Sequence, residues 1–181
     1  MASGWQEDAG DNWKGDKSTL SDVCHKLLQQ KITPNEAFKA LTLELQKSYD
    51  INRGFLALRE DRQARFLAVA RFTDSGTLKS LSLQIPSINS VFERVAEDGG
   101  IYVDNFAELF EGNTIENRLL IGEDTQSFVL RPLKSDGRLV GLLGYSSDVT
   151  DAFVTFEDGL LDPVIDCLTS VIVGTSDKVK P

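Results

Sequence analysis

Hydrophobic residues recur with a helical period near the start of the chain. From Thr19 onward, one apolar stripe is formed by Leu20, Val23, Cys24, Leu27 and Leu28. A second helix is predicted over residues 34–49, because Thr33 and Glu36 have the spacing of a capping box and Pro34 suits the first helical position. Its apolar stripe comprises Phe38, Leu41, Leu45 and Tyr49. Two helices, each with one face to bury, are therefore expected before the first strand.

The following segments have the patterns of strands. Apolar runs at residues 55–58 and 65–72 flank a polar turn at 60–63 and predict a hairpin. Leucine and isoleucine then alternate with polar residues over 80–85 until Pro86, which is typical of a half-exposed strand. Next, Ser87 is predicted to cap a helix whose apolar face carries Ile88, Val91, Phe92 and Val95 and which ends at Gly99 and Gly100.

Strands and a long helix are predicted in the C-terminal half as well. A brief strand at 101–103 is followed by an irregular segment, residues 104–126, with one or two short helical pieces. Strands at 127–133 and 139–146 flank Ser135-Asp136-Gly137, a clear hairpin signal. The last helix carries the apolar residues from Leu160 to Ile172, and Pro163 lies near its start or bends it. This order predicts an α+β fold: an antiparallel sheet of about six strands with the helices of both chain ends on one face.

Three stretches of the sequence share their pattern with a known family. Ser127 to Leu133 is an apolar strand ending in Pro-Leu, and Asp136 to Leu143 continues with a polar turn and a strand that contains glycine. Phe156-Glu157-Asp158, followed by two leucines, opens the last helix, and between Val95 and Asp104 a helix ends at glycine and a strand ends at aspartate. These motifs, over about residues 34–173, resemble those of GAF domains. The resemblance implies a small-molecule pocket on the face of the sheet opposite the terminal helices, beneath the irregular segment.

The irregular segment itself favours a covered site. A stretch of about 20 residues without regular structure is unusual within a domain unless it covers a site. Its apolar side chains must also be buried against something. Residues 104–126 are therefore predicted to form a lid, whose bulky Phe106 and Phe110 either line the pocket or fill it.

Length and composition fit one domain. The chain has 181 residues, of which 41% are hydrophobic and 26% charged, and its formal net charge is −9. Such an acidic chain is not expected to bind nucleic acid or an anionic membrane, which require clustered cations. We expect a disordered leader at residues 1–17, a single GAF-like domain over 18–174 and a polar tail at 175–181. Without a spanning segment, a secretory signal or enough cysteines for a disulfide framework, the sequence predicts a reducing, cytoplasmic setting.

Patterns for catalysis or cofactor binding are sparse. His25 is the only histidine, so schemes that pair histidine with a nucleophile or a metal lack partners. Cys24-His25 resembles the pair that carries a bilin in some GAF photoreceptors, yet it precedes the first strand. Some GAF domains reduce free methionine sulfoxide with pocket cysteines, but no cysteine lies between residues 25 and 166. Cys24 and Cys167 lie on apolar helical stripes, which favours packing. We therefore expect no enzyme activity, no cofactor and no metal.

Arginines supply the remaining candidate chemistry. On the strand at 127–133, Ser127, Val129, Arg131 and Leu133 share one face. The charge of Arg131 in a central strand must be paired, with a lid acid such as Asp104 or with an anionic ligand. Arg71 occupies a similar place late in the second strand, and Arg118 lies in the lid. The candidate ligand-binding residues are Arg131, Arg71, Arg118, Asp104, Ser127, Phe106 and Phe110.

Two kinds of function fit this pattern. One is a GAF-type regulatory domain that binds a small molecule and signals through its terminal helices, within a signal-transduction or transcription-regulating system. The alternative is a ligand-free GAF fold, filled by its own side chains, that serves as a dimerisation or docking module. The apolar stripes of the terminal helices favour a homodimer through them. A pocket plugged by Phe106 and Phe110 favours docking, whereas an open cavity floored by Arg131 favours sensing.

Overall fold

A six-stranded antiparallel sheet forms the centre of the computed structural model, which describes residues 19–60, 63, 65–73, 76–98, 102–104, 110–153 and 161–179, with the backbone alone for 102–104 and 176–179. Within this part of the chain, the strand order is β3-β2-β1-β6-β5-β4. The strands are β1 (Arg53–Glu60), β2 (Arg65–Phe72), β3 (Leu78–Ile85), β4 (Tyr102–Asp104), β5 (Ser127–Ser135) and β6 (Arg138–Ser147). The predicted α+β class and the sheet of about six strands are confirmed.

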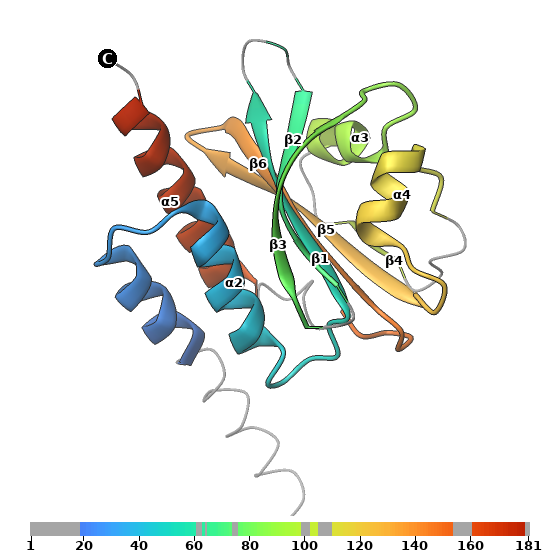
Figure 1. Cartoon of the computed structure of the whole chain (residues 1–181), viewed down its shortest axis with the longest axis horizontal. Coiled ribbons are helices and arrows are strands. Elements are labelled where there is room, and N and C mark those ends of the chain that lie inside the picture. The colour runs from blue at the N-terminus through green and yellow to red at the C-terminus, as the bar shows by residue number, and fades with distance from the viewer. Residues whose placement is uncertain are drawn as a thin grey trace, which may run out of the picture.

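The helices lie on both sides of this sheet (Figure 1). On one side are a helix over residues 19–28, α2 (Pro34–Leu45) and α5 (Asp162–Val179), as predicted for the two chain ends. On the other side are α3 (Val91–Asp98) and α4 (Thr114–Leu120). The part of the predicted lid that contains α4 therefore covers the face opposite the terminal helices.

Two hairpins form the centre of the sheet. β1 and β2 pair along their length, ending with Glu60 opposite Arg65. β5 and β6 are joined at Asp136 and Gly137, whose φ angles of 51° and 78° suit a two-residue hairpin turn. β1 and β6 then pair with each other, so the two halves of the chain share one sheet.

The terminal helices bury one face of the sheet in a first hydrophobic core. The capping box predicted at Thr33 and Glu36 is present at the start of α2. Phe38 of α2 stacks on Tyr145 of β6 with 6.0 Å between ring centroids, and the Tyr145 hydroxyl shares a 2.7 Å hydrogen bond with Thr42 Oγ1. Further members of this core are Leu41, Leu45, Val129, Leu133, Val164 and Leu168. Packing against the sheet, rather than helix propensity alone, therefore stabilises these helices.

A second hydrophobic core lies between the sheet and the helices α3 and α4. Phe55 of β1 stacks on Phe92 of α3 with 4.7 Å between ring centroids. Phe128 of β5 belongs to this core, whereas its neighbour Val129 belongs to the first, as the predicted alternation along the strand requires. Leu119 of α4 is buried in the second core as well. Both faces of the sheet are thus covered by apolar side chains.

The start of α3 differs from the sequence prediction. The helix is capped by Ser90, whose Oγ accepts a 3.0 Å hydrogen bond from Glu93 N, rather than by Ser87. Asn89 has a left-handed φ of 53°, which interrupts any helix that starts at Ser87. Ile88, predicted to be buried, is consequently 76% exposed.

Three further expectations concern the two chain ends and membrane-spanning helices. α5 continues to Val179, into the segment predicted as a polar tail. The predicted leader, residues 1–17, lies outside the described residues. Where the chain is described, none of its helices is both long enough and apolar enough to span a membrane.

Candidate functional site

A fully buried glutamate, Glu116, joins the beginnings of α3 and α4. In α4 its backbone N–H donates to Asn113 Oδ1 (3.0 Å), and its Oε2 accepts from Asn113 N (3.1 Å), which completes a capping box. The same carboxylate accepts hydrogen bonds from Val91 N (3.0 Å), Phe92 N (3.2 Å) and the Ser90 hydroxyl. The first N–H groups of a helix lack partners within it and carry partial positive charge, so they stabilise an anionic side chain. One carboxylate therefore fastens the two helices together.

Asn113 also anchors the loop that precedes α3. Its side-chain Nδ2 donates to the carbonyl oxygens of Pro86 (2.9 Å) and Ile88 (3.4 Å). These hydrogen bonds hold the segment before α4 beside a loop that lies far from it in the sequence. Because Glu116 holds it through two further hydrogen bonds, Asn113 makes a polar wall of fixed geometry next to α3.

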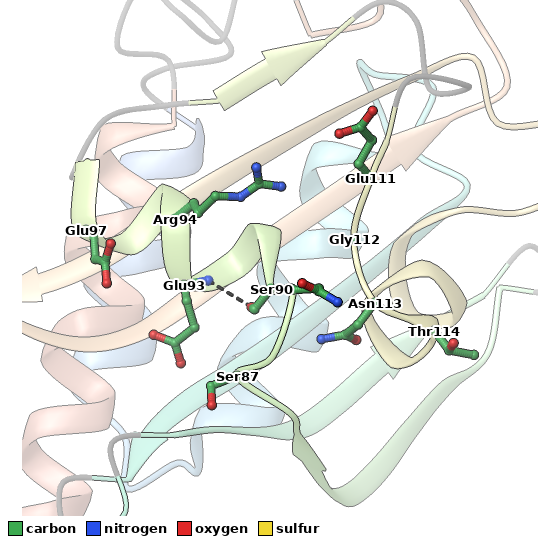
Figure 2. A pocket seen from close by; sticks show the side chains of 10 residues that line it. Ser87, Ser90, Glu93, Arg94, Glu97, Glu111, Gly112, Asn113 and Thr114 are labelled. Carbon is green, nitrogen blue, oxygen red and sulfur yellow. Dashed lines mark hydrogen bonds between the residues drawn. The ribbon is translucent and has the colours of Figure 1, made fainter.

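A polar cavity of about 770 Å³ lies between α3 and the segment before α4 (Figure 2). Its lining includes Ser90, Glu93, Arg94 and Glu97 on one side, and Glu111 and Asn113 on the other. Arg94 reaches from α3 toward the segment that carries Glu111. Glu93 is held by Arg59, whose Nη1 lies 2.7 Å and 2.9 Å from the two carboxylate oxygens. Hydroxyl, amide, carboxylate and guanidinium groups thus offer donors and acceptors to a small polar molecule.

A second cavity, of about 500 Å³, lies at the other end of α4 and brings three arginines together. This arginine cleft is lined by Arg53 of β1, Arg71 of β2 and Arg118 of α4, with Asn117, Ile121, Gly122 and Glu123 beside them. Arg71 Nη2 donates a 3.1 Å hydrogen bond to the carbonyl oxygen of Arg118. Two of the candidate residues from the sequence, Arg71 and Arg118, are therefore neighbours.

Arg53 is the member of the cleft that the sequence analysis missed. The hairpin was the available signal, because antiparallel pairing of β1 with β2 places the start of one beside the end of the other.

An irregularity in the pairing of β2 determines which face of the sheet Arg71 lies on. In β2, Ala68 belongs to the second core and Ala70 to the first, and the register with β3 shifts between them. This bulge reverses the alternation and turns Arg71 toward α4.

Arg131 lies elsewhere, which corrects its predicted place at the pocket. Its Nη2 donates a 2.6 Å hydrogen bond to Asp162 Oδ1 at the start of α5, on the face of the terminal helices. Neither cavity is lined by Arg131. The physical reason is that Asp162 pairs the charge, so neither Asp104 nor a ligand is required for it. Alternation identified which side chains share a face with Arg131, but it did not identify that face.

The remaining candidate residues are placed as follows. Ser127 is buried, and its Oγ donates a 2.7 Å hydrogen bond to the carbonyl oxygen of Val149. Phe110 packs edge-on against Phe128 with 5.3 Å between ring centroids, so this ring fills space next to the second core. The backbone of Asp104 pairs in β4 with Phe128, while the side chain of Asp104 and all of Phe106 lie outside the described residues.

The two cysteines lie in the first hydrophobic core, whereas the two cavities adjoin α3 and α4 on the other face. Both are buried free thiols, as the apolar stripes predicted. Cys24 Sγ donates to the carbonyl oxygen of Pro163 (3.3 Å), and Cys167 Sγ lies 3.9 Å from the carbonyl oxygen of Cys24. The neighbouring Cys167 side chain, and then burial, raise the pKa of the Cys24 thiol. Cys24 is therefore held as the less reactive thiol form.

His25 is exposed, and its Nε2 lies 3.2 Å from Gln29 Nε2 one helical turn away. In the described ranges, histidine, cysteine and carboxylate side chains form no group of three or more that could hold a metal ion.

Comparison with solved structures identifies the fold. The GAF domain of an Acinetobacter phosphoenolpyruvate-protein phosphotransferase matches with a TM-score of 0.69 at 15% identity, covering 91% of this chain and 95% of that domain. The GAF domain of a two-component sensor histidine kinase from Bacillus halodurans gives a TM-score of 0.59 at 14% identity, covering 77% and 96%. No protein-family model matches the chain, and no curated protein matches its sequence. The resemblance predicted from the sequence motifs is confirmed at the level of the fold.

The comparisons correct the expectation that the chain is not an enzyme. The free methionine-R-sulfoxide reductase of Neisseria meningitidis, in complex with its substrate, matches with a TM-score of 0.66 at 15% identity, covering 88% of this chain and 89% of the reductase. Free methionine-R-sulfoxide reductases of Thermoplasma acidophilum and Staphylococcus aureus match as well. The same fold therefore occurs in enzymes, so the missing sequence motif was too weak a reason to exclude catalysis.

Proposed function

We propose that this chain, which has the GAF-domain fold, is a regulatory domain that binds a small polar molecule in the cavity between α3 and the segment before α4. The observation that carries this proposal is the junction at Glu116, which fixes one wall of that cavity to both helices. An occupant in contact with Ser90 or Asn113, which both line the cavity and bond to Glu116, would act directly on this junction. The volume of about 770 Å³ also falls within the roughly 300–1,000 Å³ typical of small-molecule sites.

A route from this cavity to the terminal helices supports a regulatory role. The carbonyl oxygen of Leu120, at the end of α4, accepts a hydrogen bond from Ser146 Oγ of β6. The preceding residue, Tyr145, points to the opposite face and shares a hydrogen bond with Thr42 of α2. A shift of α4 would therefore reach α2 through two adjacent residues of one strand. A ligand drives such a shift only by its different affinity for the two arrangements.

The matched structures favour a place in signal transduction. Both a phosphotransferase and a two-component sensor histidine kinase carry a GAF domain that shares this fold. A chain of this fold would pass its ligand-dependent change to a partner or an attached domain through the helices at its ends.

Native mass spectrometry of the protein purified from its own host tests this proposal, because a retained molecule is weighed directly. We expect a bound mass on the wild-type protein and on Lys39→Glu, a control on the exposed side of α2. Arg94→Glu, which also changes an exposed side chain, is expected to lose that mass because it reverses a charge in the cavity. The same bound mass on Arg94→Glu, or none on the wild-type protein, would contradict the proposal.

Packing beneath α3 and α4 favours a second candidate function, that of a dimerisation or docking module. The rings of Phe55, Phe92, Phe110 and Phe128 occupy the space next to the sheet. A domain whose apolar interior is filled by its own side chains does not need a ligand to complete its core.

A homodimer through the terminal helices is the form of this module that we propose. Leu28, on the helix over residues 19–28, is 49% exposed, and Leu43 of α2 is 47% exposed. Sedimentation velocity tests the proposal: a dimer is expected for the wild-type protein and a monomer for the double variant Leu28→Glu, Leu43→Glu. A wild-type protein that stays monomeric at the highest attainable concentration would rule it out.

A further inference from the structure

The arginine cleft gathers positive charge in a protein of the opposite net charge. The chain has a formal net charge of −9, yet the cleft is lined by three guanidinium groups and one carboxylate, that of Glu123. The arginines come from three different elements, β1, β2 and α4, so their meeting is a product of the tertiary fold. Three guanidinium groups against one carboxylate give the lining a net positive charge, which attracts an anion.

Two local features orient the guanidinium groups of the cleft. Arg71 is held beside α4 by its 3.1 Å hydrogen bond to the carbonyl oxygen of Arg118. Arg53 lies against the chain just after α4, where Gly122 leaves room for it. A Cβ atom at Gly122 would lie 2.6 Å from Cζ and Nε of Arg53, closer than such atoms can approach. Glycine at this position therefore lets the Arg53 guanidinium lie beside the backbone.

We propose that the arginine cleft binds an oxyanion, the phosphate or carboxylate group of a small molecule. Guanidinium presents its N–H groups in a planar fork that matches two oxygen atoms of such a group. Arg118 and Asn117, which are both exposed, add donors from α4. The cleft, of about 500 Å³, has room for such a group together with the rest of a small molecule.

An anion in this cleft would hold α4 to the sheet. Arg118 belongs to α4, whereas Arg53 and Arg71 belong to strands, so one bound group bridges the helix and the sheet. α4 also carries Glu116 at its other end, where its carboxylate accepts hydrogen bonds from Ser90 and Asn113, two residues that line the polar cavity. The arginine cleft is nevertheless a separate site from that cavity, because the two share no lining residue.

Nuclear magnetic resonance titration of the full chain tests the proposal. The probes are inorganic phosphate and citrate, added through the millimolar range at a fixed ionic strength of about 0.15 M maintained with sodium chloride. We expect saturable shifts of the backbone amides of Asn117, Gly122 and Glu123 with at least one probe. The probe that binds more tightly distinguishes phosphate from carboxylate recognition.

Arginine variants identify the binding groups. Arg118→Gln, which changes an exposed side chain, is expected to bind the probe about tenfold more weakly, and Arg53→Gln provides a second test from the sheet. Arg131→Gln and Arg94→Gln are matched controls, because neither residue lines the cleft, and both are expected to bind as the wild type does. Loss of affinity in Arg94→Gln alone would assign the anion to the other cavity and overturn the proposal.

Two further results would also overturn it. One is shifts that rise linearly with either probe, without saturation. The other is equal affinity of Arg118→Gln and the wild-type protein. Both results leave the proposed function of the polar cavity intact, since that function depends on Arg94 and not on the arginine cleft.

Discussion

Replacing Glu116 by glutamine tests whether its carboxylate fastens α3 to α4. The carboxylate is fully buried and accepts hydrogen bonds from Ser90, Val91, Phe92 and Asn113. Glutamine keeps the shape but turns one acceptor oxygen into an NH₂ group, which leaves at least one buried N–H donor without an acceptor. An unsatisfied buried donor costs about 1–3 kcal/mol, and loss of charge at the helix N-terminus about 0.3–1 kcal/mol more. We therefore expect Glu116→Gln to lower the free energy of unfolding by about 1.3–4 kcal/mol.

α2 supplies a matched control for this variant. Glu36 holds the same capping-box position as Glu116 and accepts a 2.8 Å hydrogen bond from Thr33 N, but Glu36 is exposed to solvent. Because water replaces the lost acceptor, we expect Glu36→Gln to cost less than about 1 kcal/mol. Urea unfolding followed by circular dichroism measures both variants, and unchanged m-values show that the unfolding reaction is the same. Equal losses for the two variants would refute the role assigned to Glu116.

Three further predictions concern the cores and α5, and each is measured by the same urea unfolding. Tyr145→Phe removes the hydrogen bond to Thr42 and is expected to cost about 1–2 kcal/mol. Burial raises the pKa of Tyr145 above its ordinary value, so the unfolded state loses this proton first. Wild-type stability should therefore fall as pH rises above about 10, and less steeply in Tyr145→Phe; equal slopes would contradict this. Gly144→Ala places a methyl group against the Phe55 ring and should lower the free energy of unfolding by about 1–3 kcal/mol. In Gly174→Ala the added methyl group points into open space, so this variant should instead stabilise α5 by about 0.5–1 kcal/mol. A lower free energy of unfolding for Gly174→Ala would contradict the described packing.

Elements with local signals could be predicted from the sequence. The start of α2 depends on Thr33 and Glu36, which are three residues apart, and the β5–β6 turn depends on Asp136 and Gly137. The start of α3 has such a signal as well, because Ser90 and Glu93 have the spacing of a capping box and Glu93 N donates to Ser90 Oγ, yet the prediction chose Ser87. Ser87 has no glutamate or glutamine three residues later, and the left-handed Asn89 interrupts a helix that starts there, so Ser90 is the cap.

The positions of the arginines in the candidate site depend on tertiary packing, which local patterns do not show. Arg71 and Arg118 were predicted separately, but their meeting needs the bulge in β2 and the packing of α4 on the sheet. Arg131 was misplaced because its partner, Asp162, lies on a helix far along the chain. Period-two alternation groups side chains by face, and only tertiary packing decides what each face meets.

The sequence did not indicate that Glu116 is buried. A glutamate at the third position of a short helix is ordinarily a solvated partner in a capping box, as Glu36 is. Glu116 is buried because α3 lies against the start of α4 and supplies further donors. The prediction that the chain is not an enzyme failed for a related reason, because it relied on missing motifs, whereas activity depends on the geometry of a site.

A crystal structure of the protein purified without denaturation from its own host tests the central claim most directly. The account predicts electron density for a small polar molecule between α3 and residues 111–114, within hydrogen-bond distance of Arg94 or Asn113. Density for water alone in that cavity would contradict the account.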